Sequence, residues 1–460
     1  MFEKLKFTPG DVPIYRQIAD RIASEISEGR LAIGDRLPPQ RDIARMAGVN
    51  LTTVTRAFAD LQQRGLVESR PGRGSIIADP SITASFKSSP VEEQGFIDLS
   101  VNRPATTGYL EALAALMPHL ADDRRYPVLQ DFHAPEGPAW AREALAAWLA
   151  PVSGTNDPAQ VIMTNGAQHG LACVLGAFAR PGDSILADAI TYQGIGALCR
   201  SLDLTLRPVA MDAGGMRPDA FEEACVAHNP SAVFLVPTLH NPTTITLAAE
   251  RRAQLAAIAR KHRLLIIEDD VYRPLKVVAP PAFVLSDPDI TIHVGGLSKC
   301  VAPGLRLGAV IAPKPMVSDI AAMLRINCWS TSPLNALVAT RMIEDGLVSS
   351  VIAGQRAEFV ARQAIVREVL SGFDLMTDDV ATHFWLQLPD PWHGNAFARA
   401  ASQAGVGVLA GEVFAVGRDS IAHAVRINVG AARSRASLRH ALEALREVLS
   451  GGRRLFDTMI

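Results

Sequence analysis

The sequence predicts a small N-terminal α+β unit, joined by a linker to a much larger α/β body. Three observations carry this prediction. Residues 14–73 combine helical periodicity with clustered arginine. Residues 79–95 are rich in Ser, Pro and charged residues and have no clear period. From about Phe96 onward, short apolar runs alternate with helical patterns, which is typical of an α/β fold with a mostly parallel sheet.

The composition is that of a soluble globular protein. The chain has 460 residues, of which 48% are hydrophobic and 20% charged, and its net charge is −2. This length corresponds to about three compact units. No apolar run reaches the roughly 18 residues of a membrane span, and the N-terminus has no apolar signal core. The five cysteines are scattered and include no CxxC pair, which argues against a disulfide framework or a structural zinc site. We therefore expect a cytoplasmic, multidomain protein that does not bind membranes.

Basic residues are unevenly distributed along the chain. The segment from Arg36 to Arg73 holds seven basic and three acidic residues, a balance of +4, which leaves −6 for the rest of the chain. A basic island on an acidic body indicates a local site for a polyanion. A solvated charged face is the alternative interpretation.

The first 64 residues predict three helices. Isoleucine recurs every four residues over 14–26 and forms an apolar stripe on the first helix. A second helix, over about 40–46, begins after two prolines and ends at Gly48. A third, over about 51–64, begins after Asn50, a good N-cap. Two short helices joined by a tight turn, with polar and basic residues near the start of the second, fit the major groove of DNA.

A β-hairpin is predicted directly after the third helix. Residues 66–70 form its first strand, Pro-Gly-Arg-Gly at 71–74 forms the turn, and residues 75–78 return. The glycines of the turn permit close approach to a phosphate or a groove wall, so the hairpin is a plausible wing.

Three sequence motifs occur in order within residues 11–78: LPPQRDIARMAGVN, LTTVTRAFADLQQRGLV and PGRGS. They resemble the DNA-binding domain of GntR-type regulators, a winged helix-turn-helix. The resemblance implies that the following residues face double-stranded DNA: Arg41, Arg45, Thr52, Thr53, Arg56, Arg73 and Gly74.

Six buried strands are predicted in the body, over residues 161–164, 184–187, 233–236, 264–267, 291–294 and 309–312, with a helix over 249–262 between two of them. Asn165–Gln168 follows the first strand and opens a helix, whose free N–H groups can bind an anion. Lys299 follows the fifth strand and could form an imine with an aldehyde cofactor. Ser298 and Arg306 could grip a phosphate, although a lone Ser-Lys pair is more often a surface loop.

Further polar residues lie at or just after strand ends. Asp269 could pair with a protonated pyridine nitrogen, and Tyr272 and Asn241 could bond a ring hydroxyl. Tyr192 could stack on the ring, and Arg426, in a late strand, could bind a carboxylate through two hydrogen bonds.

The motifs GAQ, TYQG, NPT, EDDVY, SK and RLG, followed by the late arginine, occur in one order over the body. They resemble the type I fold of aspartate aminotransferase relatives, with a large and a small domain, over about residues 96–450. The resemblance implies pyridoxal 5'-phosphate (PLP) as cofactor and an internal aldimine on Lys299, the catalytic residue. It also assigns cofactor contacts to Ala167, Gln168, Tyr192, Asn241, Asp269, Tyr272, Ser298 and Arg306, and substrate or effector binding to Arg426.

The sequence departs from that family's pattern at three points. The asparagine motif reads NPTT, and Gly296 stands where relatives often have a second hydroxyl for the phosphate. The aromatic residue that the partner subunit usually contributes is ambiguous, since both Tyr126 and Phe132 precede Gly137.

A GntR-like head on an aminotransferase-like body is the arrangement of MocR-type regulators. The resemblance implies a PLP-dependent transcriptional regulator that senses an amino compound, or PLP itself, through the aldimine at Lys299. The alternative is an active aminotransferase with an appended DNA-binding domain. We expect a homodimer, with residues 1–78 as the DNA-binding domain, 79–95 as the linker and 96–460 as the PLP-binding body. Its small domain lies near 96–140 and 335–460, and its large domain spans about 140–334.

Overall fold

The computed structural model describes residues 13–27, 30–31, 34–63, 66–70, 74–77, 92–93, 95–390, 392–417 and 423–457. The chain forms two compact units, Met1–Ser89 and Pro90–Ile460, which we call the head and the body.

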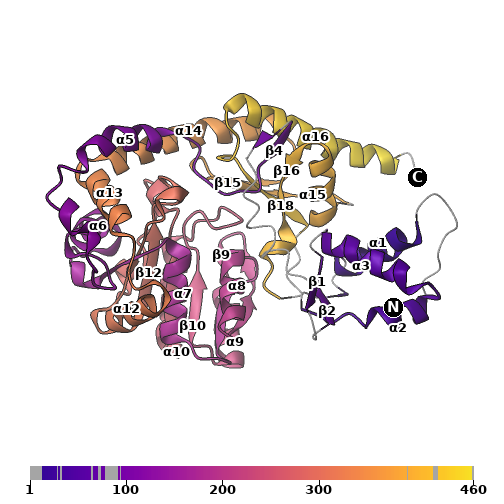
Figure 1. Cartoon of the computed structure of the whole chain (residues 1–460), viewed down its shortest axis with the longest axis horizontal. Coiled ribbons are helices and arrows are strands. Elements are labelled where there is room, and N and C mark those ends of the chain that lie inside the picture. The colour runs from indigo at the N-terminus through magenta and orange to yellow at the C-terminus, as the bar shows by residue number, and fades with distance from the viewer. Residues whose placement is uncertain are drawn as a thin grey trace. The chain divides into compact units, whose positions relative to one another are not determined.

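The head is a three-helix unit with a β-hairpin (Figure 1). Its elements are α1 (Ile14–Ser27), α2 (Gln40–Ala47), α3 (Leu51–Gln63), β1 (Val67–Arg70) and β2 (Gly74–Ile77). The strands are antiparallel, with Val67 opposite Ile77 and Arg70 opposite Gly74. The predicted winged helix-turn-helix is therefore confirmed, with its helix ends within two residues of those predicted.

The turn between α2 and α3 depends on two residues. Gly48 has a φ of 65°, in the left-handed region that glycine adopts at little cost, and its backbone N–H caps α2. The side-chain oxygen of Asn50 then accepts a hydrogen bond of 3.2 Å from the backbone N–H of Thr52, as expected of an N-cap. These two residues set the tight angle between the helices.

The core of the head is small and is built from the apolar stripes of its elements. Its fully buried members include Ile18, Ile22, Ile43, Val54, Phe58, Leu61, Val67 and Ile77. Ile14, the first residue of the predicted stripe, is 43% exposed. It occupies the first position of α1, so the stripe reaches the core only one turn later.

We expect Phe58→Ala to unfold the head while the body stays folded. The Phe58 side chain is 1% exposed, and truncating a buried phenylalanine to alanine costs about 3–5 kcal/mol of the free energy of unfolding. That is a large share of the roughly 5–15 kcal/mol that stabilises an ordinary domain. A calorimetric melt should show that the head unfolds at a lower temperature in the variant than in the wild type. Val278→Ala is the control because that side chain is 85% exposed, and an equal loss in both variants would contradict the assigned core.

The body is built on a seven-stranded sheet with the strand order β5-β13-β12-β11-β10-β6-β7. The strands are β5 (Val161–Thr164), β6 (Ser184–Asp188), β7 (Thr205–Val209), β10 (Ala232–Leu235), β11 (Leu265–Asp269), β12 (Thr291–Gly296) and β13 (Gly308–Ile311). Only β13 runs antiparallel to its neighbours, β12 and β5. The predicted mostly parallel sheet is thus confirmed. β7 is not among the strands predicted from the sequence, because it is a partly exposed edge strand that contains Pro208.

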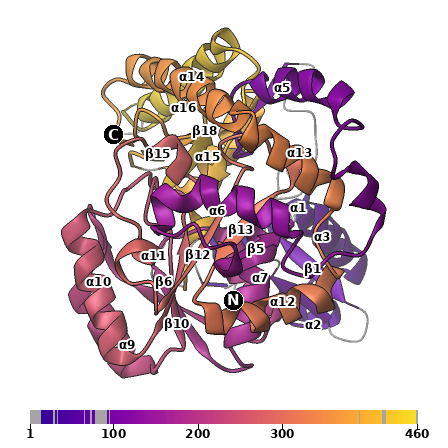
Figure 2. The same cartoon turned by 90° about the vertical axis from the view of Figure 1, so that its left-hand side faces the viewer.

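Helices flank this sheet (Figures 1 and 2). They are α6 (Ala139–Ser153), α7 (Ala167–Phe178), α8 (Gln193–Ser201), α9 (Pro218–His228), α10 (Ala249–His262), α11 (Phe283–Ser286) and α12 (Lys314–Cys328). The short strands β8 (Met211–Asp212) and β9 (Gly215–Met216) form a separate hairpin. Among the helices of the described residues, none has the length and apolar character needed to cross a membrane.

A second part of the body holds the smaller sheet β14-β15-β18-β17 (Leu375–Met376, His383–Gln387, Ala424–Asn428 and Leu409–Ala410). Its helices are α5 (Gly108–Leu116), α13 (Pro333–Glu344), α14 (Leu347–Val369), α15 (Gly394–Gln403) and α16 (Arg435–Asp457). A three-stranded sheet lies beside them, with β16 at Val406–Gly407, β4 at Phe96–Asp98 and β3 at Glu92–Glu93, in the order β16-β4-β3.

The predicted linker, 79–95, is wrong at its C-terminal end. Glu92–Glu93 forms β3, which pairs antiparallel with β4, Glu93 lying opposite Phe96. Gly95 has a φ of 90° and makes this tight reversal possible. The pairing therefore places Glu92, Glu93 and Gly95 in the body. Residues 78–91 lie outside the described part of the chain.

Candidate functional site

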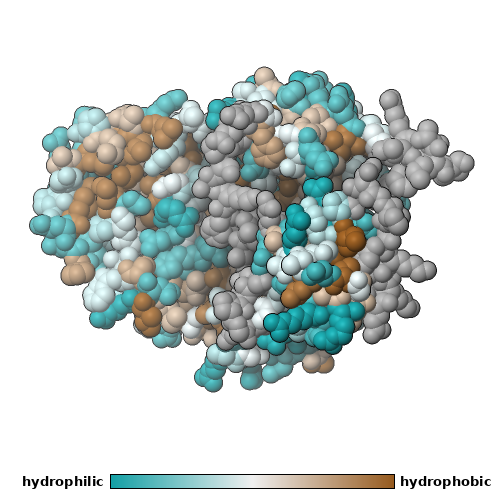
Figure 3. Space-filling view, turned by 45° about the vertical axis from the view of Figure 1, so that its right-hand side comes forward, coloured by the Kyte–Doolittle hydropathy of each residue, from teal (hydrophilic) through white to brown (hydrophobic). Residues whose placement is uncertain are grey.

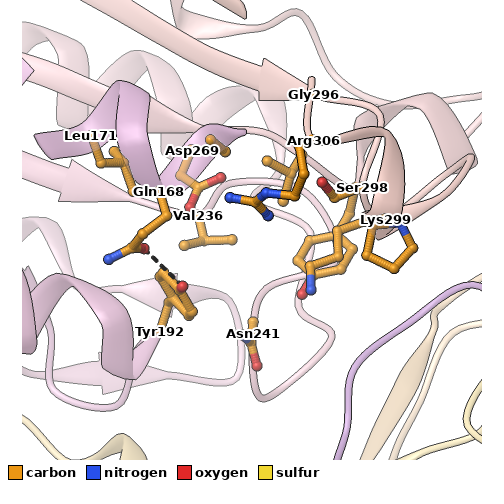
Figure 4. Close-up of a pocket in the computed structure, with 14 residues that line it drawn as sticks. Gln168, Leu171, Tyr192, Val236, Asn241, Asp269, Gly296, Ser298, Lys299 and Arg306 are labelled. Atoms are coloured by element: carbon orange, nitrogen blue, oxygen red, sulfur yellow. Dashed lines mark hydrogen bonds between the residues drawn. The ribbon is translucent and has the colours of Figure 1, made fainter. Parts of the chain in front are cut away.

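All the residues expected to contact the cofactor line one pocket of the body (Figure 4). Its lining includes Ala167, Gln168, Tyr192, Asn241, Asp269, Tyr272, Ser298, Lys299 and Arg306. The remaining lining residues are Leu171, Val236, Val271, Gly296 and Pro303, which the sequence analysis did not assign to the cofactor.

The sheet topology explains why residues far apart in the sequence meet here. β6, β10, β11 and β12 are parallel neighbours, so their carboxyl ends lie at one edge of the sheet. Tyr192 follows β6, Asn241 follows β10, Asp269 ends β11 and Lys299 follows β12. Ligands of open α/β sheets bind at this edge.

The N-terminus of α7 and Arg306 form an anion cradle. Gly166 precedes α7 with a φ of 86°, and no side chain caps this helix. A Cβ on Gly166 would lie 3.0 Å from Nη2 of Arg306, so the glycine lets the guanidinium approach the helix end. That Nη2 donates a hydrogen bond of 2.8 Å to the backbone oxygen of Asn165. A helix N-terminus beside a guanidinium fits a phosphate group.

The structure explains why position 296 lacks a hydroxyl residue. A Cβ on Gly296 would lie 3.0 Å from the backbone oxygen of Leu307 and 3.3 Å from Cα of Gly308. The Leu307 oxygen accepts a hydrogen bond of 3.1 Å from the backbone N–H of Leu297, and Gly308 pairs with Gly296 itself between β12 and β13. A side chain at position 296 would require these backbone atoms to shift by a few tenths of an ångström, which disfavours a serine here.

Lys299 is held deep in the pocket. Its Nζ donates a hydrogen bond of 2.9 Å to the backbone oxygen of Asn102. Burial, followed by the positive charge of Arg426, lowers the pKa of the Lys299 amine to about 8. About a tenth of the amine is therefore unprotonated at pH 7, and this is the form that attacks an aldehyde.

Asp269 is buried, and its Oδ1 has no hydrogen-bond partner among the described residues. Burial raises the pKa of its carboxyl group to about 7. An unpartnered carboxylate oxygen in a dry pocket is costly unless a cation or a donor meets it. A protonated pyridine nitrogen would supply both, so Asp269 and the anion cradle together fit PLP.

Two tyrosines lie around the pocket with different partners. The hydroxyl of Tyr192 donates a hydrogen bond of 2.8 Å to Oε1 of Gln168 (Figure 4). The hydroxyl of Tyr272 accepts one of 2.8 Å from Nδ2 of Asn102. Burial raises the pKa of both phenols, so both stay neutral and can donate hydrogen bonds to a ligand.

Arg426 lies beside the pocket without belonging to its lining. Its Nη1 donates to Oδ1 of Asn241 at 3.0 Å and its Nη2 donates to the backbone oxygen of Ser100 at 2.7 Å. The ring of Phe414 lies 5.0 Å from the guanidinium carbon. Burial lowers the pKa of Arg426 to about 10, so the group still carries its charge at neutral pH. A buried guanidinium of this kind can bind a carboxylate.

Asn102 contacts both Lys299 and Tyr272, and the sequence analysis missed it. It lies in the stretch Leu-Ser-Val-Asn-Arg-Pro after β4, more than 160 residues before Tyr272. No motif marks it, because its partners come from distant segments of the chain.

Asp269→Asn should change the pH dependence of stability in the PLP-free protein. The folded state keeps a proton on Asp269 up to about pH 7, whereas the unfolded state loses it near pH 4. Since the folded state binds more protons over that range, the wild type loses free energy of unfolding as pH rises through it. Asparagine has no such dependence. Between pH 4 and 7, the free energy of unfolding of the variant should therefore rise relative to that of the wild type by at most about 4 kcal/mol.

Thermal melts of both proteins from pH 5 to 8 measure this difference. Adding PLP should make the wild type more stable than the variant, since only the wild type offers a carboxylate to the ring nitrogen. Parallel stability curves at every pH would contradict the burial of a titrating carboxyl group.

The head presents most of its predicted DNA-facing residues to solvent. Arg41, Arg45, Thr52, Arg56 and Gly74 are exposed, and Thr53 is half-buried. Gly74 has a φ of 84° and open space where a Cβ would lie. Arg73 lies outside the described residues.

Two of these arginines already make contacts within the head. Arg45 forms an ion pair of 3.1 Å with Asp42, and the guanidinium of Arg56 lies 4.9 Å from the centre of the Tyr15 ring. Both contacts are at the surface, where such pairs are weak, so both side chains can turn to a phosphate or a base.

Comparison with known protein families matches both units. The model of aminotransferases of class I and II matches residues 94–445. The chain belongs to the aminotransferase class I and II family. The model of bacterial regulatory proteins of the gntR family matches residues 14–77, so this aminotransferase-like chain carries a GntR-type DNA-binding domain.

Similar proteins share this organisation or the fold of its body. The uncharacterized HTH-type transcriptional regulator YdeF of Bacillus subtilis is 28% identical over 437 residues, which cover 95% of this chain and 94% of YdeF. The vitamin B6 salvage pathway transcriptional repressor PtsJ of Salmonella typhimurium is 29% identical over 428 residues, or 90% of this chain and 93% of PtsJ.

Among solved structures, the α-aminoadipate aminotransferase LysN of Thermus thermophilus superposes with a TM-score of 0.72 at 22% identity. The match covers 81% of this chain and 97% of LysN, which was solved with N-(5'-phosphopyridoxyl)-L-leucine. At this identity the likeness establishes the fold of the body, which is the predicted type I fold.

Proposed function

We propose that this protein is a PLP-dependent, DNA-binding transcriptional regulator that senses an amino compound, or PLP itself, at Lys299. One observation carries the proposal: the residues expected around PLP converge on a single pocket in a chain that also has a GntR-type head. When bound, PLP supplies an aldehyde that reacts with amines and a ring that accepts electrons.

The residues of the pocket provide a way to sense an amine. Lys299 and an effector amine have the same chemistry towards an aldehyde, so they compete for it. Arg426 offers a charged partner to a carboxylate on the same effector. An α- or ω-amino acid meets both requirements. Regulation then requires that the effector bind two arrangements of the protein with different affinities.

Titration of DNA binding tests the proposal. Fluorescence anisotropy would follow the full chain on a duplex from upstream of its own coding sequence, with a scrambled duplex as control. The titration is repeated with PLP and with a panel of α- and ω-amino acids. Couplings of this kind change affinity about 5- to 150-fold. The proposal fails if DNA affinity is the same with PLP, without PLP and with every amino acid.

We infer that the protein acts as a homodimer. Hydrophobic residues gather on part of the surface of the body (Figure 3). Large apolar side chains of the body that are exposed in a single chain include Leu110, Met117, Tyr126, Phe132, Ile326 and Trp329. The rings of Phe132 and Trp329 pack with centroids 5.4 Å apart, which supports an interface built around Phe132. Neither Tyr126 nor Phe132 belongs to the pocket lining of its own chain, so either could serve a partner's pocket. Light scattering of the PLP-loaded protein checks this, and a monomer would contradict it.

An aminotransferase is the second candidate function. It is favoured by a lysine and a buried carboxyl group in one pocket, Lys299 and Asp269, with the buried Arg426 beside it. Multiple-turnover production of keto acid at about 1–1000 s⁻¹ would establish it. A single slow half-reaction would leave regulation as the main role.

A further inference from the structure

A second cavity of the body adjoins the cofactor pocket. Its volume is about 450 Å³, and Pro303 lines both spaces. Arg103 and Val301 also line it. Arg103 directly follows Asn102, whose backbone oxygen accepts the hydrogen bond from Lys299, and Val301 comes shortly after Lys299 in the chain. The cavity therefore lies beside the segments that hold the reactive amine, and its size is typical of small-molecule sites, which span roughly 300–1,000 Å³.

The lining of this second cavity is positively charged. Arg103 and Arg433 contribute two guanidinium groups, and none of the described residues that line the cavity is acidic. Nη2 of Arg103 donates a hydrogen bond of 2.9 Å to the backbone oxygen of Ala431, which anchors the side chain without neutralising its charge. The other lining residues are mostly small or apolar, among them Tyr109, Leu110 and Ala302. Such a lining suits a ligand with an anionic end and a carbon chain.

Two buried side chains of α14 hold the walls of the second cavity in place. Oε1 of Gln355 accepts a hydrogen bond of 2.8 Å from the backbone N–H of Ala105. Nη1 of Arg362 donates one of 2.8 Å to the backbone oxygen of Ala432. Gln355 is fully buried and Arg362 is 2% exposed, whereas Ala105 and Ala432 line the cavity. The walls are therefore fixed before a ligand binds, which reduces the entropic cost of binding.

We propose that the second cavity binds the far end of the effector, and that this end carries a carboxylate or phosphate group held by Arg103 and Arg433. The inference rests on the proposed function, because the amine of the same effector has to reach the pocket of Lys299. Arg426 remains available for the carboxylate beside that amine. The effector class is thereby narrowed to amino compounds with a second anionic group, such as amino dicarboxylates and phosphorylated amino acids.

The experiment titrates the full chain, loaded with PLP, with pairs of ligands that differ only in the charge of the far end. Glutamate is compared with glutamine, the next longer amino dicarboxylate with its amide, and O-phosphoserine with serine. The visible absorbance of bound PLP gives each affinity, and isothermal titration calorimetry gives it without relying on that colour. In the wild type we expect at least one acid to bind about tenfold or more tightly than its neutral partner. The pair that shows the preference distinguishes carboxylate from phosphate.

Arg103→Gln and Arg433→Gln remove one charge each and keep most of the side-chain volume. Each should reduce the preference for the acid several-fold, and the double variant should abolish it. Free glycine has an amine and a carboxylate but no far end, so its affinity should stay unchanged in these variants. Arg260→Gln is the matched control, because this exposed arginine pairs with Asp287 and lines neither cavity.

Gly304→Leu tests the second cavity without changing a charge. Gly304 lines the cavity, and a Cβ at this position meets no atom within 4 Å. A leucine side chain can therefore occupy part of the space without displacing the backbone. We expect the variant to bind glycine like the wild type and to lose at least about tenfold in affinity for the preferred acid.

The outcomes separate the two proposals. A wild type that takes up no PLP overturns the proposed function, and the second site falls with it. A PLP-loaded wild type that binds every acid and its neutral partner alike overturns the second site and leaves the proposed function standing. A preference that survives in the double arginine variant also overturns the second site, since another group then binds the anion. If the arginine variants do not load PLP, Gly304→Leu decides, and an unchanged affinity for the preferred acid overturns the second site.

Discussion

Lys299→Ala is expected to abolish covalent attachment of PLP while leaving the pocket folded. The lysine amine is the only group of the pocket lining with this reactivity, and burial lowers its pKa to about 8, which keeps part of it unprotonated. The variant should lose the visible absorbance band, and borohydride treatment should leave no phosphopyridoxyl group on the peptide that contains position 299. Mass spectrometry of digests of the wild type and the variant measures how much of this peptide carries the phosphopyridoxyl group.

The control for this variant is Lys314→Ala. Lys314 is an exposed lysine that pairs with Asp157 at 2.6 Å, away from the pocket lining. The Lys314→Ala variant loses the same charge as Lys299→Ala and should keep the full visible absorbance band. Residual weak binding of PLP to Lys299→Ala is expected, because Arg306, Asp269 and the N-terminus of α7 remain. A band of normal strength in Lys299→Ala would mean that another amine carries the cofactor.

Arg41→Ala/Arg56→Ala should weaken operator binding by at least about tenfold and make it less sensitive to salt. Both side chains are exposed on the two helices of the helix-turn-helix. Each lost phosphate contact lowers the slope of log affinity against log salt by about 1, and a lost base contact costs about 1–3 kcal/mol. Anisotropy titrations at several salt concentrations measure the affinity and the slope together.

Arg260→Ala/Arg439→Ala removes two arginines from the surface of the body and serves as the control. These side chains pair with Asp287 and Glu368, each at 2.7 Å. If electrostatic attraction by the whole chain drove binding, both double variants would lose affinity equally, and the DNA-facing surface assigned to the head would be wrong.

Local patterns made the head readily predictable. Val54, Phe58 and Leu61 recur at helical spacing and all lie in the core. Gly48 and Asn50 are read correctly as the turn because their effects are local: one permits a left-handed φ and the other caps the next helix. The short strand β3 was missed because its pairing depends on where β4 lies and on the φ of Gly95.

The sequence by itself indicated nine of the 14 residues that line the pocket. Asp269 ends a buried strand and Lys299 follows another, and parallel strands bring their carboxyl ends to one edge of the sheet. The roles of these residues rest on the family resemblance, because many turns of α/β folds carry similar polar residues.

Only the tertiary structure decided what depends on distances between remote segments. It places a backbone oxygen 3.0 Å from where a Cβ of Gly296 would lie, so a larger residue there requires the backbone to shift. It also brings Asn102 within hydrogen-bonding distance of Lys299, Tyr272, Thr382 and Asn428. Neither fact has a local signature, because a hydrogen bond or a steric contact is set by the separation of atoms in space, and packing of the two sheets alone fixes that separation.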